Sequence, residues 1–201
     1  MRVTSVPLGA KGFDTVEPLT NASAASLRAE GATYVVRYLG GITGDEANAI
    51  LGAGLGLQLV TYSGAVGWMP SAELGESQGQ EDLVHLGALG VPAGALVWID
   101  LEGAGADPTS WVNARSEKLV EKGYVVGLYV GAGCVLDGEK LYALPYVTRY
   151  WRAFNAGIPE PQCGFCQWQL FPPNQSVQGV EVDFDFSGED YEGRKALMLV
   201  A

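Results

Sequence analysis

Hydrophobic and polar positions follow a repeating order along the chain, in which a short β-branched and aromatic run precedes an amphipathic stretch bounded by glycine. The run Thr33–Tyr38 is typical of a buried strand, and Thr43-Gly-Asp-Glu46 after it has the pattern of a capping box that opens a helix. Strand and helix alternate in this way in α/β proteins with parallel sheets.

Eight strand-like runs are found, and a helix is predicted after most of them; the last two runs are joined by a loop without a helix pattern. Eight strands in 201 residues predict one domain, residues 1–201, folded as a compact (β/α)8 TIM-type barrel with reduced or missing helices in its second half. A doubly wound open sheet is the structural alternative. The tail Lys195–Ala201 fits either a helix or a strand.

The ends of the expected strands favour the barrel, because the active sites of such barrels form where the carboxyl ends of several strands meet. In chain order these ends carry Asp14, Tyr38, Tyr62, Asp100 with Glu102, Tyr129, Trp151, Gln169, and Asp183 with Asp185. Closure of the barrel would place the first strand beside the eighth, and therefore Asp14 near Asp183. We expect these side chains to share one mouth.

Asp100-Leu-Glu102 is the central chemical feature. Side chains alternate along a strand, so these two carboxyl groups point to the same side, about 7 Å apart at the backbone. Two carboxyl groups in a partly dry cleft do not both ionise easily, and the one that keeps its proton can act as an acid. Glycoside cleavage requires such an acid and a second carboxylate.

Composition and charge limit the classes of molecule that the protein is expected to bind. The net charge is −11 and basic residues are scattered, which argues against nucleic acid and anionic lipid, and no apolar run is long enough to span a membrane. The N-terminus lacks a signal-peptide pattern. Cys163-Gly-Phe-Cys166 has CxxC spacing, but with His85 as the lone histidine we interpret it as buried thiols or a local disulfide, and we expect neither metal nor cofactor.

Another motif, Gly75-Glu-Ser77-Gln-Gly79, matches the serine-hydrolase nucleophile pattern. It has no buried strand before it, and such a strand is needed to expose the serine at a sheet edge. We therefore interpret it as part of a helix.

The chain resembles a known family in five segments: Gly12-Phe-Asp14, Tyr34–Tyr38, Trp98-Ile-Asp-Leu-Glu102, Gln167-Trp-Gln169 and Val182-Asp183. These look like the glycoside-hydrolase-like domain of unknown function 1906, which is related to the family 25 lysozymes, barrels that hydrolyse the glycan of peptidoglycan. The resemblance spans nearly the whole chain. It implies an extracellular, cell-wall or phage-associated protein, which in nature would be part of a larger multidomain or phage protein.

The resemblance also implies roles for single residues. Glu102 would be the general acid, Asp100 would help to polarise the reaction, Asp14 and Asp183 would orient and charge-balance the site, and Gln169 would help to line it. Aromatic side chains suited to a sugar ring are Tyr38, Tyr62, Trp68, Tyr129 and Trp151.

Three functions fit these residues. The first is a glycoside hydrolase acting on peptidoglycan or a related cell-wall glycan. The second is a catalytically inactive barrel that binds or anchors a carbohydrate. The third is another enzyme that uses the same carboxylates, such as a metal-dependent phosphodiesterase, which a requirement for divalent ions would reveal.

Overall fold

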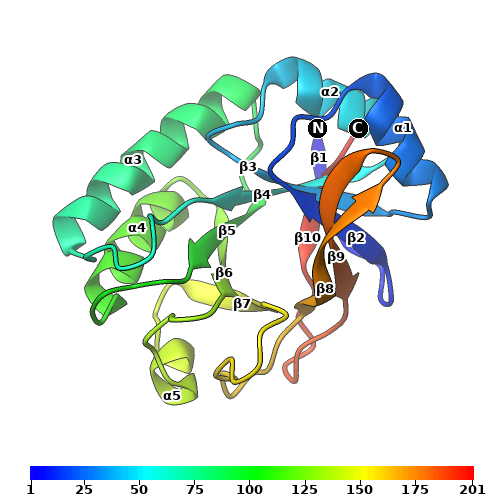
Figure 1. The fold of residues 1–201 in the computed structure, drawn as a ribbon. Helices are drawn as coiled ribbons and strands as arrows, with labels where there is room; N and C mark the ends of the chain where they lie inside the picture. Colours follow the sequence, from blue (N-terminus) through cyan, green and yellow to red (C-terminus); the bar gives the residue numbers. More distant parts are fainter.

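A closed barrel of eight strands forms the centre of the computed structural model, which describes residues 1–201 (Figure 1). The barrel strands are β2 (Lys11–Thr15), β3 (Tyr34–Tyr38), β4 (Gly56–Thr61), β5 (Leu96–Leu101), β6 (Val125–Val130), β7 (Val147–Arg152), β8 (Gln167–Val177) and β9 (Val180–Ser187). Neighbours pair in this order, and β9 closes the ring by pairing with β2. The predicted single barrel is confirmed.

Helices cover mainly the side of the barrel formed by β3 to β6 (Figure 1). They are α1 (Asn21–Ala29), α2 (Gly44–Gly52), α3 (Ala72–Leu89), α4 (Thr109–Glu121) and the short α5 (Gly138–Tyr142). No helix lies between β8 and β9, as predicted. Thr43 caps α2 by accepting a hydrogen bond from the Glu46 backbone N–H, while the Glu46 side chain forms a buried ion pair with Arg37 instead of completing a capping box.

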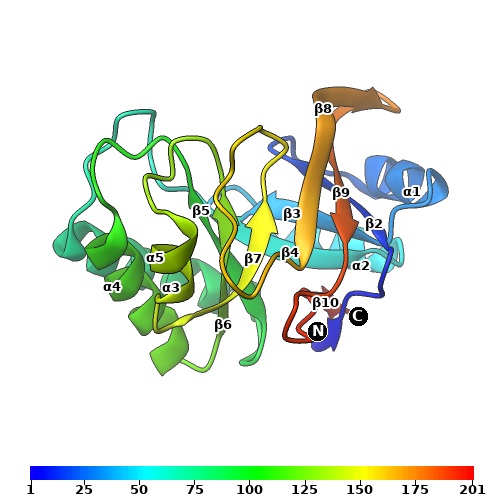
Figure 2. The same ribbon diagram turned by 90° about the horizontal axis from the view of Figure 1, so that it is seen from below.

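The eighth barrel strand differs from a regular (β/α)8 barrel. Strands β2 to β8 are parallel to one another, but β9 is antiparallel to both β8 and β2. A hairpin joins β8 to β9 and rises above the carboxyl ends of the parallel strands (Figure 2). The tail forms a strand, β10 (Leu197–Val200), which pairs with β1 (Arg2–Ser5) at the opposite end of the barrel.

Buried residues form two layers. A cluster of 37 residues fills the space between the barrel and its helices, and includes Val97 and Ile99 of β5. A second cluster of 12 residues fills the barrel interior and includes Trp98 of the same strand together with Trp151. The alternation of inward and outward side chains along β5 therefore places Trp98 in the core, as expected, and points Asp100 inward.

Two sequence motifs have structural roles. Cys134, Cys163 and Cys166 are free and buried, and burial raises the pKa of the Cys166 thiol to about 12. The two glycines of the Gly75–Gly79 motif lie within α3, where a Cβ at Gly75 would come within 2.3 Å of the Trp111 carbonyl oxygen. These glycines let α3 approach α4 closely. None of the helices combines the length and apolar character needed to cross a bilayer.

Candidate active site

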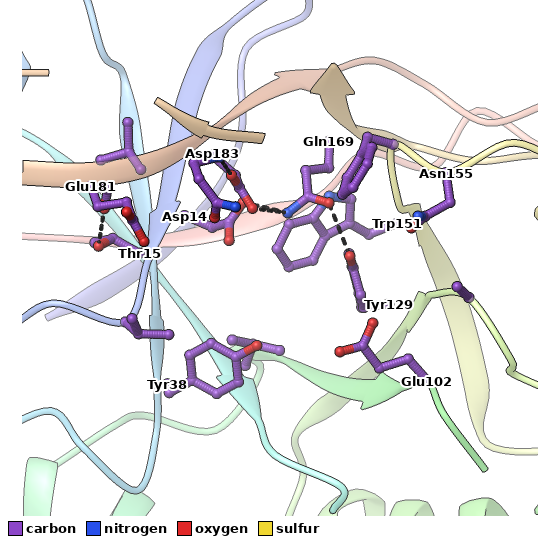
Figure 3. Close-up of a pocket in the computed structure, with 16 residues that line it drawn as sticks. Asp14, Thr15, Tyr38, Glu102, Tyr129, Trp151, Asn155, Gln169, Glu181 and Asp183 are labelled. Carbon is purple, nitrogen blue, oxygen red and sulfur yellow. Dashed lines mark hydrogen bonds between the residues drawn. The ribbon is translucent and has the colours of Figure 1, made fainter. Parts of the chain in front are cut away.

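A cavity of about 330 Å³ opens at the carboxyl ends of the parallel strands (Figure 3). It is lined by Asp14, Thr15, Val16, Tyr38, Val60, Glu102, Tyr129, Ala132, Trp151, Phe154, Asn155, Gln169, Asn174, Glu181, Val182 and Asp183. Four of these side chains are carboxyl groups and none is basic. Residues from every part of the chain therefore meet at one mouth.

Gln169 organises one wall of the cavity. The Tyr129 hydroxyl donates to Gln169 Oε1 at 2.9 Å, which leaves the amide Nε2 facing the carboxyl groups. That nitrogen donates to Asp183 Oδ2 at 2.8 Å and to Asp14 Oδ2 at 3.1 Å (Figure 3). Asp14 and Asp183 are opposite each other in the β2–β9 register, so backbone pairing and one amide together hold the two carboxyl groups side by side.

Glu102 faces the cavity from the other side. It follows the last residue of β5, and Figure 3 shows its carboxyl group directed inward, across from Asp14 and Asp183. Its main chain is anchored because the Trp68 indole N–H donates to the Glu102 carbonyl oxygen at 2.9 Å. Gly131 lies against it, and a Cβ at that position would come within 2.6 Å of both Glu102 Cβ and Oε2.

Asp100 lies deeper in the barrel and does not line the cavity. It is buried, accepts a hydrogen bond from the Tyr38 hydroxyl at 3.5 Å, and has no partner for Oδ1. Asp100 differs in this respect from Glu102, whose side chain is only half-buried. Asp100 and Glu102 thus point the same way, as predicted, but at different depths.

Burial sets the protonation of these groups. Loss of solvent raises the pKa of Asp14 to about 8, with a further contribution from neighbouring Asp183. Burial, followed by repulsion from Glu102, raises the pKa of Asp100 well above its ordinary value, and burial also raises the pKa of Glu102. Asp14 therefore retains a proton at neutral pH, and burial favours the protonated forms of Asp100 and Glu102, which is the form that general-acid chemistry requires.

The structure brings together most of the residues expected at the site. Asp14, Tyr38, Glu102, Tyr129, Trp151, Gln169 and Asp183 line the cavity. Tyr62 is not among them, and lines a second cavity beside the first. Trp68 is also outside both cavities: its ring packs on Trp111, with centroids 4.6 Å apart, and it supports the Glu102 main chain.

Several cavity residues were not anticipated from the sequence. Glu181 lines the cavity two residues before Asp183, so strand alternation was a usable signal for it. Asn174 reaches the site through an irregularity in β8, where its backbone N–H donates to Asp183 Oδ1. Asn155 comes from a loop and carries no sequence signal. No group of three or more His, Cys, Asp and Glu side chains is arranged to hold a metal ion.

A barrel with carboxyl groups on both sides of a cavity at its strand ends is the arrangement of glycoside hydrolase-like proteins. The family model of the Rv2525c-like, glycoside hydrolase-like domain matches residues 25–190, and the chain belongs to this family. The resemblance found in the sequence motifs is confirmed. Comparison with curated protein sequences gives no match.

Solved structures share the fold. An uncharacterized protein of B. stearothermophilus superimposes with a TM-score of 0.71 at 21% identity, covering 89% of this chain and 96% of that one. The Tat-secreted protein Rv2525c of Mycobacterium tuberculosis, crystallised with L-tartrate, gives 0.63 at 19% identity, covering 92% and 100%. The catalytic domain of endolysin ply40 from bacteriophage P40 of Listeria monocytogenes gives 0.63 at 16%, covering 90% and 94%.

Proposed function

We propose that this protein is a glycoside hydrolase that cleaves the glycan of peptidoglycan or a related cell-wall polymer. Family membership and the likeness to the catalytic domain of a phage endolysin support the substrate class. The likeness to a Tat-secreted protein supports action outside the cytoplasm, at the cell wall. A cavity rich in carboxyl groups and without a basic side chain favours a neutral glycan over a phosphate-bearing ligand.

One observation carries this proposal: Glu102 faces Asp14 and Asp183 across the cavity (Figure 3). Glycosidic cleavage needs a protonated acid on one side of the bond and a carboxylate on the other. Burial raises the pKa of Glu102 and so favours the protonated form that donation to the leaving oxygen requires. Glu102 would give up this proton as the bond to the sugar breaks, and a water molecule would form the new bond to the sugar carbon and return a proton to the site.

The opposite wall would support the positive charge that develops on the sugar ring. Asp183 accepts hydrogen bonds from Gln169 and from the Asn174 backbone, so its carboxylate is held in one orientation. Asp14, beside it, is the group that keeps a proton, because burial raises its pKa to about 8. When ionised, Asp100 would place a negative charge beneath Glu102. When protonated, it would act through its hydrogen bond with the Tyr38 hydroxyl.

The test is release of reducing ends from purified peptidoglycan and from chitin-type oligosaccharides, comparing the wild type with Glu102→Gln. We expect the substitution to lower the rate by about a thousandfold, since it removes the transferable proton, while circular dichroism and the melting temperature stay unchanged. Activity that persists in the folded variant would remove Glu102 from the role of acid.

A different result would change the class of function. If the folded wild type releases no product from any of these glycans and yet binds them saturably, the protein is a carbohydrate-binding barrel and the carboxyl groups form a recognition site. Activity that appears only with added divalent ions would favour a metal-dependent enzyme instead.

A further inference from the structure

A second cavity, of about 520 Å³, lies beside the first, and Val16 and Tyr38 line both of them. It is formed between the loop after β3, the end of β4 and the face of α3 that carries Gln78, Asp82 and His85. The first cavity reaches from β7 and β8 to Tyr38, so the two together extend across the mouth of the barrel. We propose that this second cavity binds a further sugar ring of the same glycan chain, an inference that rests on the proposed function.

A buried ion pair forms the floor of this cavity. Asp82 of α3 and Arg115 of α4 form a buried two-bond ion pair, with Nε to Oδ2 at 2.7 Å and Nη2 to Oδ1 at 2.9 Å. Arg115 Nη1 also donates to the Tyr62 carbonyl oxygen at 3.0 Å. The pair thus fixes the backbone from which Tyr62 projects, and its charges neutralise each other, so the floor offers no free cation to an anionic ligand.

The rim, in contrast, has unused binding groups. Tyr62 is 57% exposed, and its ring meets Tyr38 edge-to-face with centroids 6.4 Å apart. Its hydroxyl, the Glu81 carboxylate and the His85 imidazole form no hydrogen bond or ion pair within the protein. An exposed aromatic face beside unpaired polar groups matches a pyranose, which has an apolar face and a ring of hydroxyls. A peptide branch of the cell-wall polymer is the competing occupant.

His85 provides a direct readout, because it is the single histidine of the chain. In a Glu102→Gln background, which prevents turnover, chitin-type oligosaccharides would be titrated while the imidazole proton resonances are followed by NMR and the affinity by calorimetry. We expect a hexasaccharide to shift the His85 resonances at saturation and to bind about tenfold more tightly than a disaccharide.

Tyr62→Ala should abolish this tenfold gain and leave the affinity for the disaccharide unchanged. Tyr191→Ala removes a comparably exposed tyrosine that lines neither of the two cavities, and should keep the gain. A further variant, Glu81→Gln, should weaken the hexasaccharide alone.

The outcomes separate this inference from the proposed function. Binding of both oligosaccharides with equal affinity and no His85 shift would overturn the second sugar site and leave the proposed function standing. A His85 shift produced by a peptide-bearing glycan fragment but not by the hexasaccharide would assign the cavity to the peptide and overturn the inference. Failure of every glycan to bind would overturn both.

Discussion

The outer and inner layers of buried residues in this barrel differ in chemistry. The outer layer, between strands and helices, is a continuous cluster of 37 residues that are nearly all aliphatic or aromatic. The inner layer has 12 hydrophobic residues, and among them lie Tyr34, Gln167 and Asp185, whose side-chain polar atoms are buried without a hydrogen-bond partner in the protein. Such atoms oppose folding.

This difference indicates that the outer layer mainly stabilises the fold and the inner layer mainly supplies the functional groups. Because burial of apolar surface is the main favourable contribution to folding, most of the stability should come from the outer layer. The inner layer contributes less to stability because it contains unpartnered buried polar atoms, but it supplies the buried carboxyl groups below and around the cavity. Substitutions in the two layers should therefore affect different properties.

Ile99 and Asp100 test this difference on adjacent positions of β5. Ile99→Ala removes a fully buried side chain of the outer layer and should lower the free energy of unfolding by about 3 kcal/mol, with little change in rate. Asp100→Asn keeps the shape of a protonated carboxyl group, so we expect the stability to change by less than about 1 kcal/mol. It removes the negative charge that Asp100 places beneath Glu102 when ionised, so we expect roughly a hundredfold slower cleavage. Urea unfolding measures the stability of each variant and the reducing-end assay measures its rate. A large loss of rate in Ile99→Ala with a large loss of stability in Asp100→Asn would refute the proposed difference between the layers.

Asp185 tests the inner layer through pH. Burial, and then the charges of Asp14 and Asp183, raise its pKa in the folded protein. The folded state therefore retains a proton that the unfolded chain releases above about pH 4, and stability should fall as pH rises from there through the folded pKa. Asp185→Asn should remove up to about 1.4 kcal/mol per pH unit from this slope.

The measurement is urea unfolding of the wild type and Asp185→Asn between about pH 5 and pH 8. Part of the slope should remain in the variant, because the pKa values of Asp14 and Asp100 are raised as well. Two parallel slopes would show that Asp185 does not retain its proton in the folded protein over this range.

The strand ends were predictable from the sequence because the barrel places them all on one face. Even the reversal of β9 left that prediction intact: Asp183 lies in the first half of this descending strand, opposite Asp14. The hairpin itself was missed because its turn, Gln178-Gly179, has positive φ at both residues, 52° and 83°, and glutamine is not a usual residue at such a position.

Loop-borne features could not be predicted in the same way. The stretch after β4 carries Tyr62 and Trp68, and neither residue reaches the first cavity, because periodicity fixes the direction of a strand side chain but not the path of a loop. Gly131 is a similar case: in the sequence it simply follows β6, whereas its neighbour in space is Glu102. Contacts between distant segments carry no local signal.

Gly131 gives the smallest expected effect. Its φ lies outside the left-handed region, so alanine there is unstrained in its backbone, but the new Cβ would overlap Glu102 and displace its carboxyl group. We expect Gly131→Ala to slow cleavage about tenfold, with a changed KM only as a minor effect, because misplacing a catalytic group raises the barrier more than it weakens binding.

Two further measurements show whether Gly131 acts through Glu102. The high-pH limb of the rate profile, where loss of the Glu102 proton ends activity, should shift in Gly131→Ala, since the displaced carboxyl group has a different exposure to solvent. Gly87→Ala is the control: a Cβ there meets nothing within 4 Å, and alanine in the last turn of α3 should raise stability by at most about 1 kcal/mol without altering that limb. An unshifted limb in Gly131→Ala would mean that the glycine only packs beside the acid and does not position it.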